Sequence, residues 1–234
     1  METRGKKQLL PSNGNLYHYG GNNPVKYTDP DGKFIQTILS WQHQNSLQNK
    51  NATIGQYQSY SSKQYGETEN SVGNFGCLFT CFVNVGNSYN IRNSNGVYEE
   101  KTVAELASND DYFTFAGVSR IGGAPTDFGS STKNLKKLLF DMTGENLEVS
   151  KYYGGEKNAM LFLAQQADKE AYVIGQVKTK NGGTHFINIT GVKSDGSMNY
   201  FDPYSYNNTR NKKEYKKSDL IAIYLIYKPE GDNQ

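Results

Sequence analysis

The stretch that decides the fold is a glycine and a cysteine followed by a mostly apolar run: Gly76-Cys77-Leu78-Phe79-Thr80-Cys81-Phe82-Val83. Apolar side chains recur close to helical spacing, which predicts a buried helix running to about Tyr89. Cys77 opens that helix, where unpaired backbone N–H groups and the helix dipole favour negative charge. A thiol at this position is held more readily as thiolate, the reactive form of cysteine. Cys77 is therefore a candidate nucleophile, whereas Cys81, one turn further on among apolar neighbours, is expected in the core.

Two later segments supply the polar partners that a thiol nucleophile needs. His185 stands before an apolar strand pattern, and Asp202 stands in an Asp-Pro turn. An imidazole can take and return protons during acyl transfer, and a carboxylate can fix its tautomer. The pair Asp195-Gly196 predicts a hairpin turn between them, and with a bulge in the hairpin the two side chains become neighbours across the sheet. Asn188 is an alternative polar partner, although it should not reach the ring nitrogen easily.

Composition and charge exclude several classes of function. The chain has 234 residues, enough for one medium domain with appendages or two small domains. Its net charge of +2 is too small to argue for nucleic acid or an anionic membrane as partner. The sequence contains no run of about 18 apolar residues, so it predicts no membrane-spanning helix. The polar N-terminus does not match a secretory signal peptide, so export would depend on sequence upstream or on a carrier.

The cysteines and histidines do not predict a metal site or any other cofactor. The two cysteines lie four residues apart, and the three histidines, His18, His43 and His185, lack the spacing of metal ligands. His18 is expected to be a half-exposed strand residue. His43 has no partner in the sequence pattern and is expected to be exposed to solvent.

The composition divides the chain into three parts. Residues 1–34 are rich in turn formers and cannot bury a core alone. Residues 35–52 are predicted to be a linker of low hydrophobicity, in which Ile35, Ile38 and Leu39 can form one short helix. Residues 53–234 are predicted to form the main domain.

Helices come first in the main domain and strands later, which predicts an α+β fold with an antiparallel sheet. Beyond the helix at Cys77, we expect helices at 102–108, 131–144 and 156–169. We expect strands at 112–115, 149–153, 171–177, 185–192, 197–202 and 221–227.

The N-terminal part carries a recognisable motif in Asn15-Leu16-Tyr17-His18-Tyr19-Gly20-Gly21-Asn22-Asn23-Pro24-Val25-Lys26-Tyr27-Thr28-Asp29-Pro30-Asp31-Gly32. It resembles the closing motif of the core domain of Rhs/YD-repeat proteins, in which a β-cocoon shell ends and a variable toxin domain follows. The family cuts itself near this junction with aspartates. Most of the shell is not in this sequence, so Asp29 and Asp31 are expected to be turn residues.

This first resemblance implies that residues 1–34 are the C-terminal remnant of an Rhs core. The chain would then carry the toxin tip of a larger polymorphic protein that is secreted or delivered to a target cell. A cognate immunity protein is the partner that such a toxin implies.

The segments around Cys77, His185 and Asp202 carry a second resemblance, which spans roughly residues 55 to 204. A Gly-Cys helix start, a His-apolar strand ending in Thr-Gly-Val and a following Asp-Pro resemble the papain-like peptidases that cut bacteriocin leader peptides. The resemblance implies a papain-like fold whose cysteine helix packs on an antiparallel sheet. It also implies that Cys77 is the nucleophile, His185 the base and Asp202 the residue that orients it, acting on a protein or peptide substrate.

The same resemblance implies a glutamine that donates to the oxyanion. Gln58 is the expected residue, with Gln56 and Gln64 as rivals. The step from Cys77 to His185 is longer than this family suggests, so residues 90–129 are expected to hold an insertion.

Two classes of function stay open from the sequence. The first is a cysteine peptidase, or a thiol amidase, deamidase or transacylase on the same fold. The second is a catalytically inactive interaction or adhesion module, which the abundance of tyrosine would suit. A third interpretation is that the chain is only a fragment of the Rhs shell. The regular helix and strand pattern after residue 100 argues against it.

Overall fold

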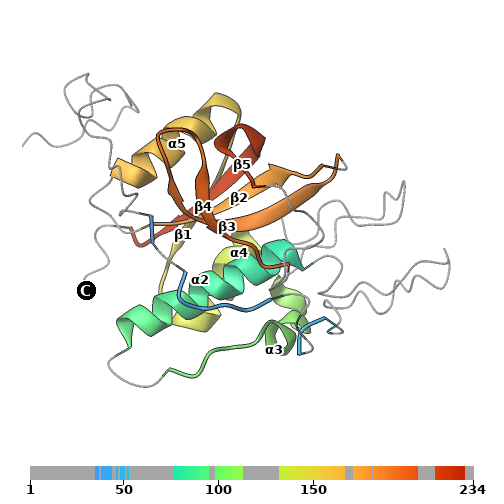
Figure 1. Cartoon of the computed structure of the whole chain (residues 1–234). Helices are drawn as coiled ribbons and strands as arrows, with labels where there is room; N and C mark the ends of the chain where they lie inside the picture. The colour runs from blue at the N-terminus through green and yellow to red at the C-terminus, as the bar shows by residue number, and fades with distance from the viewer. Residues whose placement is uncertain are drawn as a thin grey trace, which may run out of the picture.

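The structure is a computed structural model. It describes residues 35–36, 38–43, 46, 48–50, 52, 76–94, 98–112, 132–166, 171–180, 182–204 and 214–229. The Rhs-like motif with His18, Asp29 and Asp31, and the candidate glutamines Gln56, Gln58 and Gln64, lie outside these residues. Within them the chain forms an α+β fold (Figure 1).

A five-stranded antiparallel sheet lies at the centre of the fold, with strand order β1-β5-β2-β3-β4. Its strands are β1 (Glu148–Tyr153), β2 (Ala171–Lys178), β3 (Thr184–Val192), β4 (Met198–Phe201) and β5 (Leu220–Tyr227). The expected strands at 149–153, 171–177, 185–192, 197–202 and 221–227 are confirmed to within a residue or so at each end.

Helices cover both faces of the sheet, as Figure 1 shows, with α5 on one side and the other α-helices on the opposite side. The helical elements are α2 (Cys77–Asn93), α3 (Val103–Ala107), η4 (Asp110–Tyr112), α4 (Thr132–Thr143), α5 (Gly154–Gln166) and η5 (Lys217–Asp219). The expected helices are confirmed over the described residues, and α2 runs four residues beyond Tyr89. Residues 131 and 167–169 of the expected helices lie outside the described residues. The expected strand at 112–115 is wrong at its start, because Tyr112 ends the short 3-10 helix η4, and residues 113–115 lie outside the described residues.

Local sequence explains where several helices begin and end. Thr102 caps α3, since its side chain accepts from Glu105 N while the Glu105 side chain accepts from Thr102 N. Gly144 follows α4 with φ of 71°, a left-handed conformation that glycine adopts without strain. By contrast, no side chain caps α2, whose N-cap residue is Gly76.

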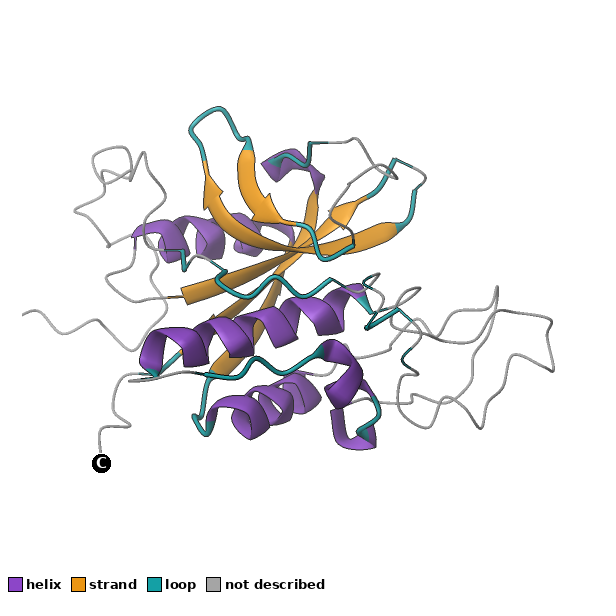
Figure 2. Ribbon diagram, turned by 60° about the horizontal axis from the view of Figure 1, so that its bottom comes forward, coloured by secondary structure: helices purple, strands orange, loops and turns teal. Residues whose placement is uncertain are grey.

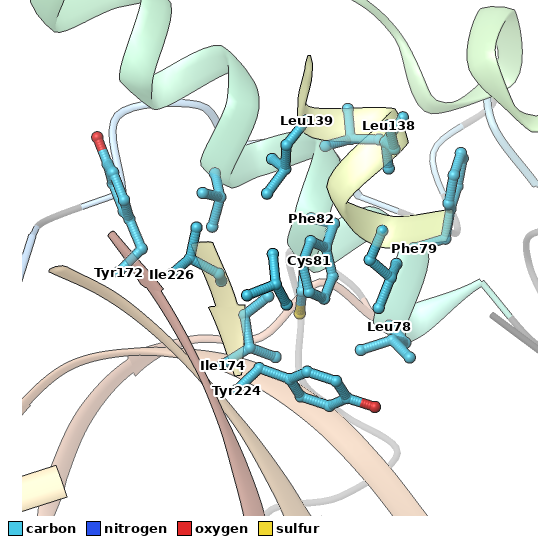
Figure 3. Packing of buried hydrophobic residues seen from close by; sticks show 14 of the residues in the cluster. Leu78, Phe79, Cys81, Phe82, Leu138, Leu139, Tyr172, Ile174, Tyr224 and Ile226 are labelled. Atoms are coloured by element: carbon cyan, nitrogen blue, oxygen red, sulfur yellow. The ribbon is translucent and has the colours of Figure 1, made fainter. Parts of the chain in front are cut away.

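Strand alternation divides the apolar side chains between two cores. On β2 and β5, Tyr172, Ile174, Tyr224 and Ile226 pack with α2 and α4 on one face. Figure 3 shows Cys81 and Phe82 of α2 among these side chains. On the other face, a second core packs against α5 and contains Val173, Ile187, Ile189, Ile223, Leu225, Leu161 and Ala164.

The segment before the main domain packs on this fold, and we call its residues 35–36 and 38–43 the strap. Ile35 forms an isolated parallel bridge with Ala171, and Gln36 N donates to Ala171 O at 2.8 Å. The strap then runs alongside α2 (Figure 2), where the amides of Leu39 and Ser40 donate to Ser88 Oγ. The short helix expected at Ile35, Ile38 and Leu39 is therefore wrong, because Ile35 lies in a β-bridge and Ile38 and Leu39 have no regular secondary structure. The domain boundary near residue 52 stays a prediction.

Candidate active site

The structure places Cys77 at the first position of α2, with its thiol free and half-buried. Thr80 N donates to Gly76 O at 2.8 Å, which closes the first helical turn around the cysteine. The first turn holds no acidic side chain and no side-chain cap. The unpaired backbone amides of this first turn therefore favour a negative charge at this end of α2.

His185 and Asp202 form a direct, nearly buried hydrogen bond. His185 Nε2 lies 2.7 Å from Asp202 Oδ1, and the two side chains are only 10% and 9% exposed. The amide of Tyr204 donates to the same oxygen at 2.8 Å, which fixes the carboxylate in the turn after β4. The carboxylate is thus oriented from two sides, and it in turn orients the imidazole.

The β3–β4 hairpin explains why these two side chains meet. His185 is the second residue of β3, and Asp202 directly follows β4. Asn188 pairs with Phe201, and the register shifts between Ile189 and Gly191, as expected for a hairpin with a bulge. The turn is closed by a hydrogen bond from Gly196 N to Lys193 O at 2.9 Å.

The Cys77 thiol lies close enough to the same imidazole to raise its pKa. Because Nε2 faces Asp202, Nδ1 is the ring nitrogen left for the sulfur. Burial by itself lowers the pKa of His185, but hydrogen bonds to Asp202 and Cys77 outweigh it and raise the pKa to about 10. The imidazole is therefore protonated at neutral pH, between a carboxylate and a thiol.

Tyrosines surround the imidazole. The rings of Tyr204 and Tyr215 lie 6.3 and 6.4 Å from the His185 ring, and the ring of Tyr200 lies 5.6 Å from that of Tyr215. Burial and the nearby Asp202 charge raise the pKa of Tyr215 to about 12. These aromatic groups limit access of water to the histidine–aspartate pair, which strengthens its electrostatic interaction.

His43, expected to be exposed, is instead buried at 5% exposure beside this site. Its ring lies 5.0 Å from the ring of Phe201, the residue before Asp202. Burial lowers the pKa of His43, against the opposing effect of the Asp202 charge. The sequence offered no signal for this position, because the ring partner of His43, Phe201, lies far along the chain.

Cys81 and Asn188 have structural contacts. Cys81 is fully buried, as expected, and burial raises the pKa of its thiol well above the usual range. Asn188, the alternative partner for His185, donates through Nδ2 to Cys81 O on α2 at 3.1 Å. Among the residues that the structure describes, no group of three or more His, Cys, Asp or Glu side chains could hold a metal ion.

No family model matches the chain, and the comparisons with curated proteins and with solved structures gave no match. Within the described residues, no helix is long and apolar enough to cross a membrane.

Proposed function

We propose that this chain carries a papain-like cysteine peptidase, with Cys77 as nucleophile, His185 as acid and base, and Asp202 as the residue that orients the imidazole. The observation that supports this most is the imidazole of His185, which meets Asp202 through Nε2 at 2.7 Å and whose pKa is raised by the nearby Cys77 thiol. A thiol, an imidazole and a carboxylate in this order are the groups that acyl transfer requires.

The chemistry follows from the positions of these groups. The sulfur of Cys77, as thiolate, attacks the carbonyl carbon of the substrate and forms a thioester, while protonated His185 donates its proton to the leaving amine as the C–N bond breaks. The imidazole then accepts a proton from water, whose oxygen attacks the thioester and releases the carboxylic acid. The sulfur leaves as thiolate, and His185 is again protonated.

The larger context of the proposal rests on the Rhs-like motif at residues 15–32. In this proposal the peptidase is the toxin tip of an Rhs-type polymorphic protein, and it is secreted or delivered to a target cell as part of that protein. Its substrate is a protein or peptide with a peptide or isopeptide bond. A cognate immunity protein would block the site in the producing cell.

The test is to replace each cysteine by alanine in turn. Cys77→Ala should abolish cleavage of a peptide library, toxicity in bacterial cells and rapid labelling by iodoacetamide. Cys81→Ala is the matched control, because that thiol is fully buried and should leave all three readouts close to wild type. Full cleavage by Cys77→Ala would refute the proposed mechanism.

The same labelling distinguishes the enzyme from an inactive interaction module. In an enzyme, Cys77 should react faster than Cys81 and at a pH well below the ~8.5 of a free thiol. Equally slow labelling of both cysteines would favour the module. Release of ammonia, instead of new peptide termini, would identify a deamidase on the same site.

A further inference from the structure

Asn188 is a buried polar residue in the middle of an apolar strand. It is fully buried, and its neighbours in β3, Ile187 and Ile189, belong to the core against α5. Its Nδ2 donates to the backbone oxygen of Cys81 at 3.1 Å. Because Cys81 lies one turn after Cys77 and Asn188 three residues after His185, this bond joins the two elements that carry the thiol and the imidazole.

Stability alone does not account for this side chain. In a regular α-helix the oxygen of Cys81 already accepts the amide of residue 85, so it does not need a second donor. Asn188 Oδ1 has no hydrogen-bond partner among the described residues, and burying such an atom is unfavourable. An apolar side chain of similar size would avoid that cost and still fill the space.

We infer that Asn188 is a positioning residue that ties the His185 strand to the Cys77 helix and so sets the distance between sulfur and imidazole. This inference rests on the proposed function. The thiol and the imidazole come from elements far apart in the sequence, so their separation depends on how closely β3 and α2 pack. Moving catalytic groups apart by about 1 Å can lower a rate on the order of a hundredfold. A direct hydrogen bond between β3 and α2 would therefore help to maintain the rate.

The test is Asn188→Leu, which keeps the branched arrangement of four side-chain atoms and removes both the bond and the unpaired oxygen. We expect the rate constant for alkylation of Cys77 by iodoacetamide at pH 7 to fall about tenfold. The pH at which labelling is half-maximal should rise toward the ~8.5 of a free thiol. On any peptide that the wild type cleaves, kcat should fall while KM changes less than about twofold. The melting temperature should change by only a few degrees.

Asn87→Leu is the matched control. Asn87 is also fully buried on α2, but it lies closer to the other end of the helix. Its Oδ1 accepts from Lys101 N at 3.0 Å, and its Nδ2 donates to Lys101 O at 2.9 Å. Its replacement should lower the melting temperature and leave Cys77 alkylation unchanged. Slower alkylation with a nearly unchanged melting temperature in Asn188→Leu, and the reverse in Asn87→Leu, would separate positioning from general stability.

If Asn188→Leu does not fold, Asn188→Thr is a second variant. Threonine is favoured in strands, and its hydroxyl is too short to keep the hydrogen bond to Cys81 O. A folded variant of either kind with wild-type alkylation kinetics and pH profile would overturn the inference. If wild-type Cys77 itself reacts no faster than a free thiol, the proposed function and this inference fall together. A reactive wild type with unaffected Asn188 variants contradicts the positioning role alone.

Discussion

The raised pKa of His185 is the feature with the clearest consequence at the level of single residues. Burial opposes the charge on this imidazole, yet the bonds to Asp202 and Cys77 bring its pKa to about 10. An unfolded histidine has a pKa of about 6.5. Between these two pH values the folded chain holds a proton that the unfolded chain has released, so the stability of the fold depends on pH.

The first prediction concerns Asp202→Asn, which removes the negative charge that supports this proton. Below pH about 6.5 both states of wild-type His185 are protonated, so the contribution of the pair to stability is fully present. As the pH rises toward 10 that contribution is lost, at most about 1.4 kcal/mol per pH unit. The free energy of unfolding of the variant should therefore lie below that of wild type at pH 6, with a gap that narrows toward pH 10.

Urea titrations of both proteins at pH 6, 8 and 10 measure this gap, and NMR titration of the His185 ring reports its pKa directly. A gap that stays constant over this range would contradict the assigned pKa.

At the level of elements, α2 has a polar side that is buried by the strap. Asn84 Oδ1 accepts from Gln42 N at 2.8 Å, and Asn84 Nδ2 donates to Gln42 O at 3.1 Å. Ser88 Oγ accepts from two strap amides and donates to Asn84 O at 2.6 Å. These side chains supply the hydrogen bonds that the backbone of the strap would otherwise make with water.

Asn84→Leu should for this reason destabilise the fold by about 2 to 4 kcal/mol, since it leaves both backbone groups of Gln42 without their partner. Thermal or urea unfolding measures the change. Asn93→Leu, at the exposed end of the same helix, is the control and should stay within about 0.5 kcal/mol of wild type. An equal loss in the two variants would argue against the strap as the cause.

At the level of the whole molecule, the strap belongs to the fold that carries the site. Ile35 and Ile38 lie in the two cores, and Ser40, His43 and Asn49 are buried. Asn49 Oδ1 also accepts from Ala104 N at 3.1 Å, which connects this segment to α3. A domain defined from residue 53 onward would lack all of these contacts.

We therefore expect a chain that starts at residue 53 to melt well below one that starts at residue 34, or to be insoluble. Both chains keep Cys77, His185 and Asp202, so slower alkylation of Cys77 or a lower melting temperature in the shorter one would reflect packing and not the loss of these three residues. Equal melting temperatures would show that the strap is dispensable and that the predicted boundary near residue 52 is correct.

Much of the secondary structure could be predicted from local patterns. The periodic apolar residues of α4, its stop at Gly144, and the Asp195-Gly196 turn each act over a few residues, and the structure follows them closely. The strap could not be predicted in this way. It leads into Gln- and Asn-rich sequence typical of a solvated linker, and its backbone bonds to Asn84 and Ser88, more than 40 residues away.

The sequence by itself determined which groups are available, a thiol at a helix start and a histidine and an aspartate on one hairpin, because residue type, helical period and turn chemistry are local properties. Only the tertiary structure decided that Cys77 and His185, 108 residues apart (185 minus 77), interact, that His43 packs on the ring of Phe201, and that Asn188 bonds to α2. That outcome depends on how α2, the strap and the sheet pack together, and packing between distant segments is not encoded in any single stretch of sequence.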